Sequence, residues 1–141
     1  MSLDIFELIR YLTLDLKIIQ QYNKQKLVPF GEFLPFKNIF NKLGLKKITE
    51  GQGSYLQGAK QTNIKIENIN ILPLICYEVI FTKFVQDASY DTNLIVNISE
   101  DGWFGDSIGP NQHFAKSIFR AIEKGTFLLR SANKGISVII D

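Results

Sequence analysis

Apolar residues fall along this chain in short groups whose spacing alternates between that of strands and that of helices. Residues 71–75 and 93–99 are strongly apolar runs rich in Ile, Leu and Val, which is typical of buried strands. Between them, residues 77–90 carry apolar side chains at helical spacing, namely Val79, Ile80, Phe84 and Val85. This order predicts a β-α-β unit in which a helical crossover joins two parallel strands.

Further elements are predicted on either side of this unit. Residues 63–69 alternate apolar and polar positions, as a half-buried strand does. Residues 112–124 predict an amphipathic helix that Gly125 ends, with one apolar side made of Phe114, Ala115, Ile118, Phe119 and Ile122. The last strands are predicted at residues 126–131 and 136–140. The alternation of helices and strands indicates an α/β fold.

The first third of the chain has a less regular pattern. Residues 3–19 mix helical spacing with alternation, and we expect a short helix followed by a strand that ends near Tyr22. Two prolines and a glycine in residues 24–36 exclude regular structure and predict an ordered loop, a common carrier of function. Residues 38–43 predict one or two helical turns, and residues 51–58 predict a connector.

Composition narrows the class of protein. The chain has 141 residues, of which 45% are apolar and 21% charged, as in a globular rather than a disordered protein. A net charge of +2 is too weak a bias to indicate nucleic acid as a partner. No run approaches the roughly 18 uninterrupted apolar residues of a membrane helix, and the start lacks the pattern of a signal peptide. We therefore expect the chain in the cytoplasm if it is made alone.

Cys76 is the single cysteine of the chain, and it lies where the apolar run 71–75 gives way to the predicted helix. A strand-to-helix junction presents a thiol at the sheet edge, close to the N–H groups that begin the helix, which suits a nucleophile. The alternative is an inert buried thiol, and for a lone cysteine after an apolar run it is the more common case. One cysteine also excludes an internal disulfide.

Several motifs, in order, resemble the nitrilase-like domain of apolipoprotein N-acyltransferases, a branch of the carbon-nitrogen hydrolases. The resemblance lies in residues 22–36 (YNKQKLVPFGEFLPF), 75–78 (ICYE), 97–113 (NISEDGWFG and GPNQH) and 120–137 (RAIE and LRSANKGIS). It implies a partial α-β-β-α sandwich over residues 1–141, with residues 1–14 weakly matched. It also implies acyl transfer from a phospholipid, through a cysteine thioester, to the N-terminal amine of a diacylglyceryl-cysteine lipoprotein.

The resemblance assigns the nucleophile to Cys76 and its cationic partner to Lys24. A thiol attacks as thiolate, so its pKa near 8.5 must be lowered by a cation, a helix N-terminus or a base. Lys24 and the backbone N–H of Tyr77 would together hold the negative charge of the tetrahedral intermediate. Taken alone, Lys24 reads as an ordinary loop lysine, and the motif around it reverses that reading.

Two carboxylates are further candidate site residues. Glu32, eight positions after Lys24, is implied as a supporting glutamate that turns inward, whereas without the motif it could equally face water. Glu78 could cap the helix after Cys76 or lie in the pocket beside Tyr77, and the two are compatible.

Trp103, the only tryptophan, sits in a glycine-flanked turn and forms either a wall or lid of the acyl pocket or part of the core beneath the turn. Before this turn the family usually has Ser-Asn-Asp, whereas this chain has Glu100 in the middle position, which puts the local hydrogen bonds in doubt. His113 has no other His or Cys at ligand spacing, so we expect neither a metal nor a cofactor.

The family's general base, a glutamate near the start of its domain, falls before the matched region, and Glu7 has no matching context. We therefore expect an inactive fragment that exposes apolar sheet, to which a separately encoded N-terminal half could contribute the base. The family also works at the bacterial inner membrane with its catalytic domain facing the periplasm. Two alternatives stay open: a soluble nitrilase-type amidase, and a non-catalytic truncated remnant.

Overall fold

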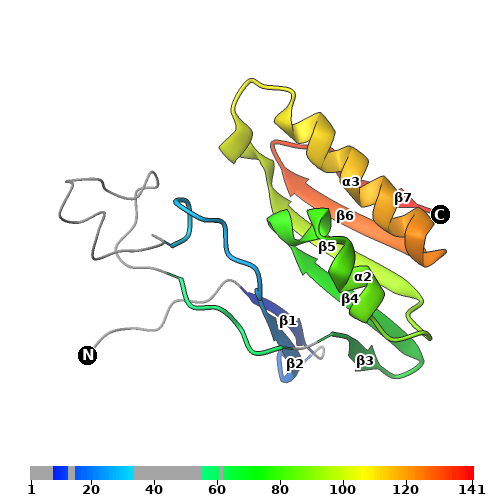
Figure 1. Cartoon of the computed structure of the whole chain (residues 1–141). Coiled ribbons are helices and arrows are strands. Elements are labelled where there is room, and N and C mark those ends of the chain that lie inside the picture. The colour runs from blue at the N-terminus through cyan, green and yellow to red at the C-terminus, as the bar shows by residue number, and fades with distance from the viewer. Residues whose placement is uncertain (1–7, 13–14, 34–54, 61) are drawn as a thin grey trace, which may run out of the picture.

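A five-stranded sheet organises the fold in a computed structural model that describes residues 8–12, 15–33, 55–60 and 62–141 (Figure 1). Its strands, in spatial order, are β3 (Ile64–Ile66), β4 (Ile69–Ile75), β5 (Leu94–Glu100), β6 (Phe127–Asn133) and β7 (Val138–Ile140). The three central strands are parallel, and both edge strands pair antiparallel. The α/β class is therefore confirmed.

Two crossovers join the parallel strands and confirm the predicted β-α-β unit. The first contains the 3₁₀ helix η1 (Cys76–Ile80) and α2 (Thr82–Asp87), and the second contains η2 (Asp101–Phe104) and α3 (Gly109–Lys124). The single helix expected over residues 77–90 is wrong in detail. Phe81 adopts extended backbone, with φ −88° and ψ 107°, and so separates η1 from α2.

The main core lies between the sheet and these helices, which cover one face (Figure 1). Alternation along the strands directs Leu72, Leu74, Ile95 and Leu128 to this face, where all four are fully buried. The opposite face is open over β6 and β7, where Phe127 is 57% and Ile139 is 71% exposed. This face of the sheet therefore presents apolar side chains to solvent.

Helix α3 is longer than its pattern predicted and is rotated differently. Pro110 lies in its first turn, and Gly125 ends it in the left-handed conformation, with φ 63°. The helix buries His113 and Arg120, whereas Phe119 and Ile122 on its apolar side are 52% and 68% exposed. These two polar side chains turn inward because they find hydrogen-bond partners there, His113 at Asp101 in η2 and Arg120 at the Ile80 carbonyl in η1.

The first described residues form a hairpin, β1 (Leu8–Leu12) and β2 (Ile18–Asn23), which packs beside β4. The strand expected near Tyr22 is confirmed, but the helix expected before it is wrong over the described residues 8–12. Ile9 packs in a second cluster with Tyr22 and Ile75, so tertiary contacts override the mixed spacing.

One other expectation is revised by the structure, and two fall partly or wholly on residues that it does not describe. Residues 63–69 are not one strand, because a turn at Glu67, with φ 52°, makes β3 and β4 a hairpin. The helical turns expected at 38–43, and residues 51–54 of the connector, lie outside the described residues. Within the part of the chain that is described, no helix is long and apolar enough to cross a membrane.

Candidate active site

A pocket of about 680 Å³ opens at the carboxyl ends of β4, β5 and β6. The strand register pairs Ile75 with Ile98 and Ile98 with Ser131, so the residues that follow these three strands meet at one edge. Four of the six predicted site residues line this pocket, namely Glu32, Cys76, Tyr77 and Trp103. Carboxyl ends of parallel strands are the usual place for ligand sites in α/β folds.

Cys76 follows the last residue of β4 and begins η1. Its φ of 50° places it in the left-handed region, which costs a non-glycine residue on the order of 1–2 kcal/mol. The residue is partly exposed at the pocket, and its thiol makes no hydrogen bond with the described residues. Such strain persists where the surroundings enforce it, often at functional sites.

Lys24 and Glu32 form a buried ion pair at the loop side of the pocket. Lys24 is fully buried, and the second carboxylate oxygen of Glu32 accepts a hydrogen bond from the Val28 N–H at 2.9 Å. The prediction that Glu32 turns inward to Lys24 is confirmed. Shared stabilisation of an oxyanion by Lys24 stays a prediction, because among the described residues no bond joins Lys24 to the thiol.

Glu78 is fully buried and joins the lysine loop to the end of β4. One carboxylate oxygen accepts from the Gln25 and Lys26 N–H groups at 2.6 and 3.0 Å, and the other from the Ile75 N–H at 2.8 Å and Tyr22 hydroxyl at 3.1 Å. Burial raises the pKa of this carboxyl, and its hydrogen bonds oppose that rise. Glu78 therefore caps the start of η1 through the Ile75 N–H, and both of its carboxylate oxygens accept hydrogen bonds.

Trp103 and Glu100 lie at the outer rim of the pocket. Trp103 is 63% exposed, so it forms a wall of the pocket and does not fill the core. The doubt about Glu100 is resolved by its contacts: the carboxylate accepts from the Gly102 N–H at 2.9 Å and from the Asn133 amide at 2.6 Å. The extra charge therefore has polar partners at the rim.

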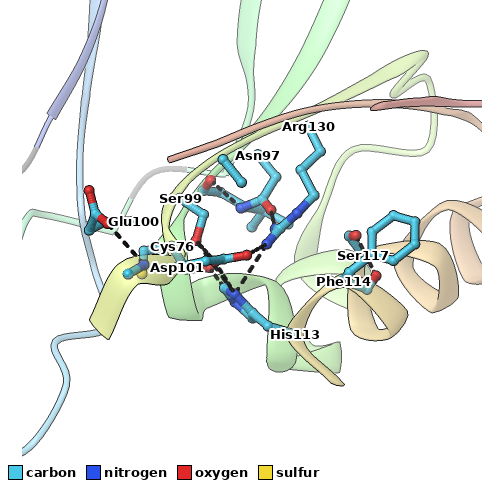
Figure 2. A network of polar contacts seen from close by, with 12 residues as sticks. Cys76, Asn97, Ser99, Glu100, Asp101, His113, Phe114, Ser117 and Arg130 are labelled. Carbon is cyan, nitrogen blue, oxygen red and sulfur yellow. Dashed lines mark hydrogen bonds and ion pairs between the residues drawn. The ribbon is translucent and has the colours of Figure 1, made fainter. Parts of the chain in front are cut away.

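A second polar group, which we call the sheet cluster, lies under the same strand ends and consists of Asn97, Asp101, His113 and Arg130 (Figure 2). Arg130 donates to Asn97 and to Asp101 Oδ2, the latter at 2.8 Å, and both members of the Arg130–Asp101 pair have fully buried side chains. Burial alone would raise the pKa of Asp101, but hydrogen bonds from Ser99 and His113 and the charge of Arg130 lower it on balance.

His113 connects this cluster to the nucleophile, with Nδ1 2.9 Å from Asp101 Oδ1 and Nε2 3.2 Å from the Cys76 carbonyl oxygen. Burial lowers the pKa of His113 and Arg130 adds to this, whereas Asp101 raises it. The sequence reading missed this cluster. Strand alternation carries a signal, because Arg130 falls on the buried face with Leu128 and Asn97 falls there with Ile95.

Among the described residues, no group of His, Cys, Asp or Glu is placed to hold a metal ion. The site is therefore a cysteine pocket flanked by a buried lysine–glutamate pair on one side and the sheet cluster beneath. The carbon-nitrogen hydrolase family model matches residues 7–141. The chain belongs to the carbon-nitrogen hydrolase family.

Curated relatives within this family carry a more specific name. Apolipoprotein N-acyltransferase of Rhodopseudomonas palustris is 44% identical over 128 residues, and those of Wigglesworthia glossinidia brevipalpis and Rickettsia prowazekii are 47% identical over 125 and 122 residues. The matches cover 85–90% of this chain but 24% of each relative. The resemblance to these enzymes is confirmed, and the chain spans about a quarter of their length.

Solved structures confirm the nitrilase-like fold. An amidase from Nesterenkonia sp. is 16% identical, with a TM-score of 0.57 over 89% of this chain and 40% of the amidase. A variant of it with an acetamide moiety on its active-site cysteine has a TM-score of 0.62 at 16% identity, over 94% of this chain and 46% of that one. At this identity the likeness establishes the fold alone.

Proposed function

We propose that the pocket at Cys76 is an acyl-transfer site that takes an acyl chain from a phospholipid and passes it to the N-terminal amine of a diacylglyceryl-cysteine lipoprotein. The observation that carries this proposal is a lone, strained cysteine at the mouth of a pocket lined by Ile75, Ile98, Trp103 and Phe104. Apolar walls suit an acyl chain, and the relatives' names support the same chemistry.

The reaction balances in two steps. The Cys76 thiolate attacks the ester carbonyl, the C–O bond breaks, and the lysophospholipid alcohol leaves with the thiol's proton, delivered through a general base. The lipoprotein amine then attacks the thioester, the C–S bond breaks, and the thiol recovers a proton from the amine. Lys24 and the Tyr77 N–H are the proposed groups that hold the oxyanion in both steps.

We propose further that the chain alone does not turn over. Glu32 and Glu100 are the carboxylates among the described pocket-lining residues, and both are engaged, Glu32 with Lys24 and Glu100 with Gly102 and Asn133. A separate polypeptide from the N-terminal part of the parent enzyme would supply the base. We also propose that the complete site lies at the periplasmic face of the bacterial inner membrane.

The test uses the purified chain with phospholipid vesicles and a diacylated lipopeptide, with and without a co-expressed N-terminal part of a relative. We expect N-acylation in the presence of that part and its loss in Cys76→Ala. Acylation by the chain alone contradicts the claim of inactivity, with Glu78 the first replacement base to examine. Ammonia release from small amides instead of acylation would support the amidase, and inertness of the thiol would support a remnant.

A further inference from the structure

His113 contacts the backbone of the nucleophile, a role that the acyl-transfer proposal leaves unexplained. Its Nε2 lies 3.2 Å from the carbonyl oxygen of Cys76. A carbonyl oxygen only accepts, so this contact is a hydrogen bond when Nε2 carries a proton. Both the imidazolium ion and the neutral Nε2–H tautomer meet that requirement, and the neutral Nδ1–H tautomer does not.

The imidazole ring is held firmly from its other side. His113 is 3% exposed, and its Nδ1 lies 2.9 Å from Asp101 Oδ1 and 3.3 Å from Arg130 Nη2. Asp101 is fixed in turn by Ser99 at 2.7 Å and by Arg130 at 2.8 Å. The ring is thus held by residues of η2 and β6, and Asp101 is held in turn by Ser99 of β5. Through the contact of Nε2 with the Cys76 carbonyl, the ring restrains the backbone at the end of β4.

The carbonyl that His113 holds belongs to the peptide that joins Cys76 to Tyr77. No peptide bond in the described residues is cis, so this peptide is trans and planar. Its N–H, which belongs to Tyr77, therefore points opposite to the carbonyl and away from His113. Both residues line the pocket, and the left-handed φ of Cys76 sets the turn between them.

We propose that His113 is a positioning residue that aims the Tyr77 N–H at the oxyanion by holding the carbonyl of the same peptide. The inference rests on the proposed function, in which Cys76 is the nucleophile and the Tyr77 N–H an oxyanion donor. A hydrogen bond accepted at the carbonyl also polarises the peptide and strengthens its N–H as a donor. His113 thus acts through the peptide and touches no substrate.

The chain allows a direct test because His113 is its only histidine and Cys76 its only cysteine. Histidine-selective ¹⁵N labelling reports the two ring nitrogens of a single residue. At neutral pH we expect Nε2 to show the chemical shift of a protonated nitrogen. An unprotonated Nε2 would overturn the proposal, because His113 would then donate no hydrogen bond to the carbonyl of Cys76.

Two matched substitutions separate the two sides of the ring. The amide nitrogen of Gln replaces Nε2 and that of Asn replaces Nδ1, so His113→Gln keeps a donor to Cys76, whereas His113→Asn keeps a polar group beside Asp101 and removes the donor to Cys76. The probe is p-nitrophenyl octanoate, whose thioester at Cys76 is identified by mass spectrometry. Its phenolate leaves with the electron pair of the broken bond, while buffer takes the thiol proton.

Alkylation of Cys76 by iodoacetamide is the control, because that displacement forms no oxyanion. We expect His113→Asn to lower the acylation rate at least about tenfold, short of the about 10²–10³ that loss of a whole oxyanion donor costs. Its alkylation rate should stay within about threefold, and His113→Gln should recover most of the acylation. Thermal denaturation confirms that both variants fold.

Three outcomes would overturn the inference or its basis. Equal acylation by the Asn and Gln variants shows that the donor to Cys76 does not matter. A parallel fall of acylation and alkylation shows a merely structural role. A wild-type chain that is alkylated but never acylated at Cys76, even together with the N-terminal part of a relative, contradicts the proposed function itself, and the inference falls with it. The nitrogen shifts still report the hydrogen bond separately.

Discussion

Two buried charged groups flank Cys76, and they differ in what they hold. The loop cluster, Lys24 with Glu32 and Glu78, uses its carboxylates mainly to bind backbone N–H groups and so fixes the shape of a loop. The sheet cluster is bound mostly side chain to side chain, and His113 links it to the nucleophile's own backbone. The loop cluster therefore fixes the loop beside the pocket, and the sheet cluster holds the backbone of Cys76.

The pKa shifts of the two groups have opposite signs. The carboxyl of Glu78 has a raised pKa, chiefly because it is buried. The carboxyl of Asp101 has a lowered pKa because Ser99, His113 and Arg130 outweigh its burial. Glu78 is therefore satisfied by neutral donors, whereas Asp101 has the Arg130 cation beside it.

The largest loss of folding stability should come from replacing Asp101 in the sheet cluster. Asp101→Ala leaves the buried Arg130 charge without its carboxylate, and breaking such a pair typically costs about 3–5 kcal/mol. We expect a loss of that order in the free energy of unfolding, measured with urea. Asp106→Ala is the matched control, since Asp106 is exposed and should change stability by less than about 0.5 kcal/mol. Equal stability of the two variants would show that the cluster contributes nothing.

A smaller effect is expected from the loop cluster at Glu78. Glu78→Ala removes hydrogen bonds to a charged group, each worth about 1.5–3 kcal/mol and not additive, so we expect a loss of roughly 2–3 kcal/mol. The loop should also come away from β4, which amide hydrogen exchange detects at Gln25 and Lys26. The amides of α3 are the internal control. Uniform acceleration at every amide would instead mean global destabilisation.

Glu32 offers the sharpest contrast between activity and stability. Glu32→Gln keeps an oxygen for Lys24 and turns an amide towards the Val28 N–H, so we expect a loss of about 1 kcal/mol in stability. Acylation of Cys76 by an activated ester should fall by about tenfold or more, because a neutral amide holds the Lys24 cation beside the proposed oxyanion less firmly than the carboxylate does. Glu100→Gln, at the other pocket-lining carboxylate, is the control. Losses of activity and stability in proportion would make Glu32 structural.

The same two groups show what the sequence can and cannot predict. Lys24 and Glu32 are eight residues apart and Cys76 and Glu78 are two apart, so local motifs identify them. The sheet cluster joins Asn97, Asp101, His113 and Arg130 from two strands and two helices, and the strand register decides that they meet. The parallel strands follow from apolar runs alone, whereas the strand at residues 8–12 depends on contacts with Tyr22 and Ile75.

The smallest effect that we expect is a pH dependence of folding stability that comes from the sheet cluster. His113 has a pKa below its usual 6.5, so the unfolded chain takes up a proton on this residue before the folded chain does. Stability should therefore fall as pH drops below about 6.5, and Asp101, with its lowered pKa, adds a second loss in stronger acid. Glu78 works in the opposite direction, since its raised pKa favours the fold at low pH.

His113→Gln removes the loss that comes from His113 and leaves the contributions of Asp101 and Glu78. The free energies of unfolding of the wild type and this variant should therefore diverge between pH 8 and pH 5, with the wild type losing more. An NMR midpoint for His113 above 6.5 would reverse the sign and show that Asp101 outweighs burial and Arg130 in this cluster.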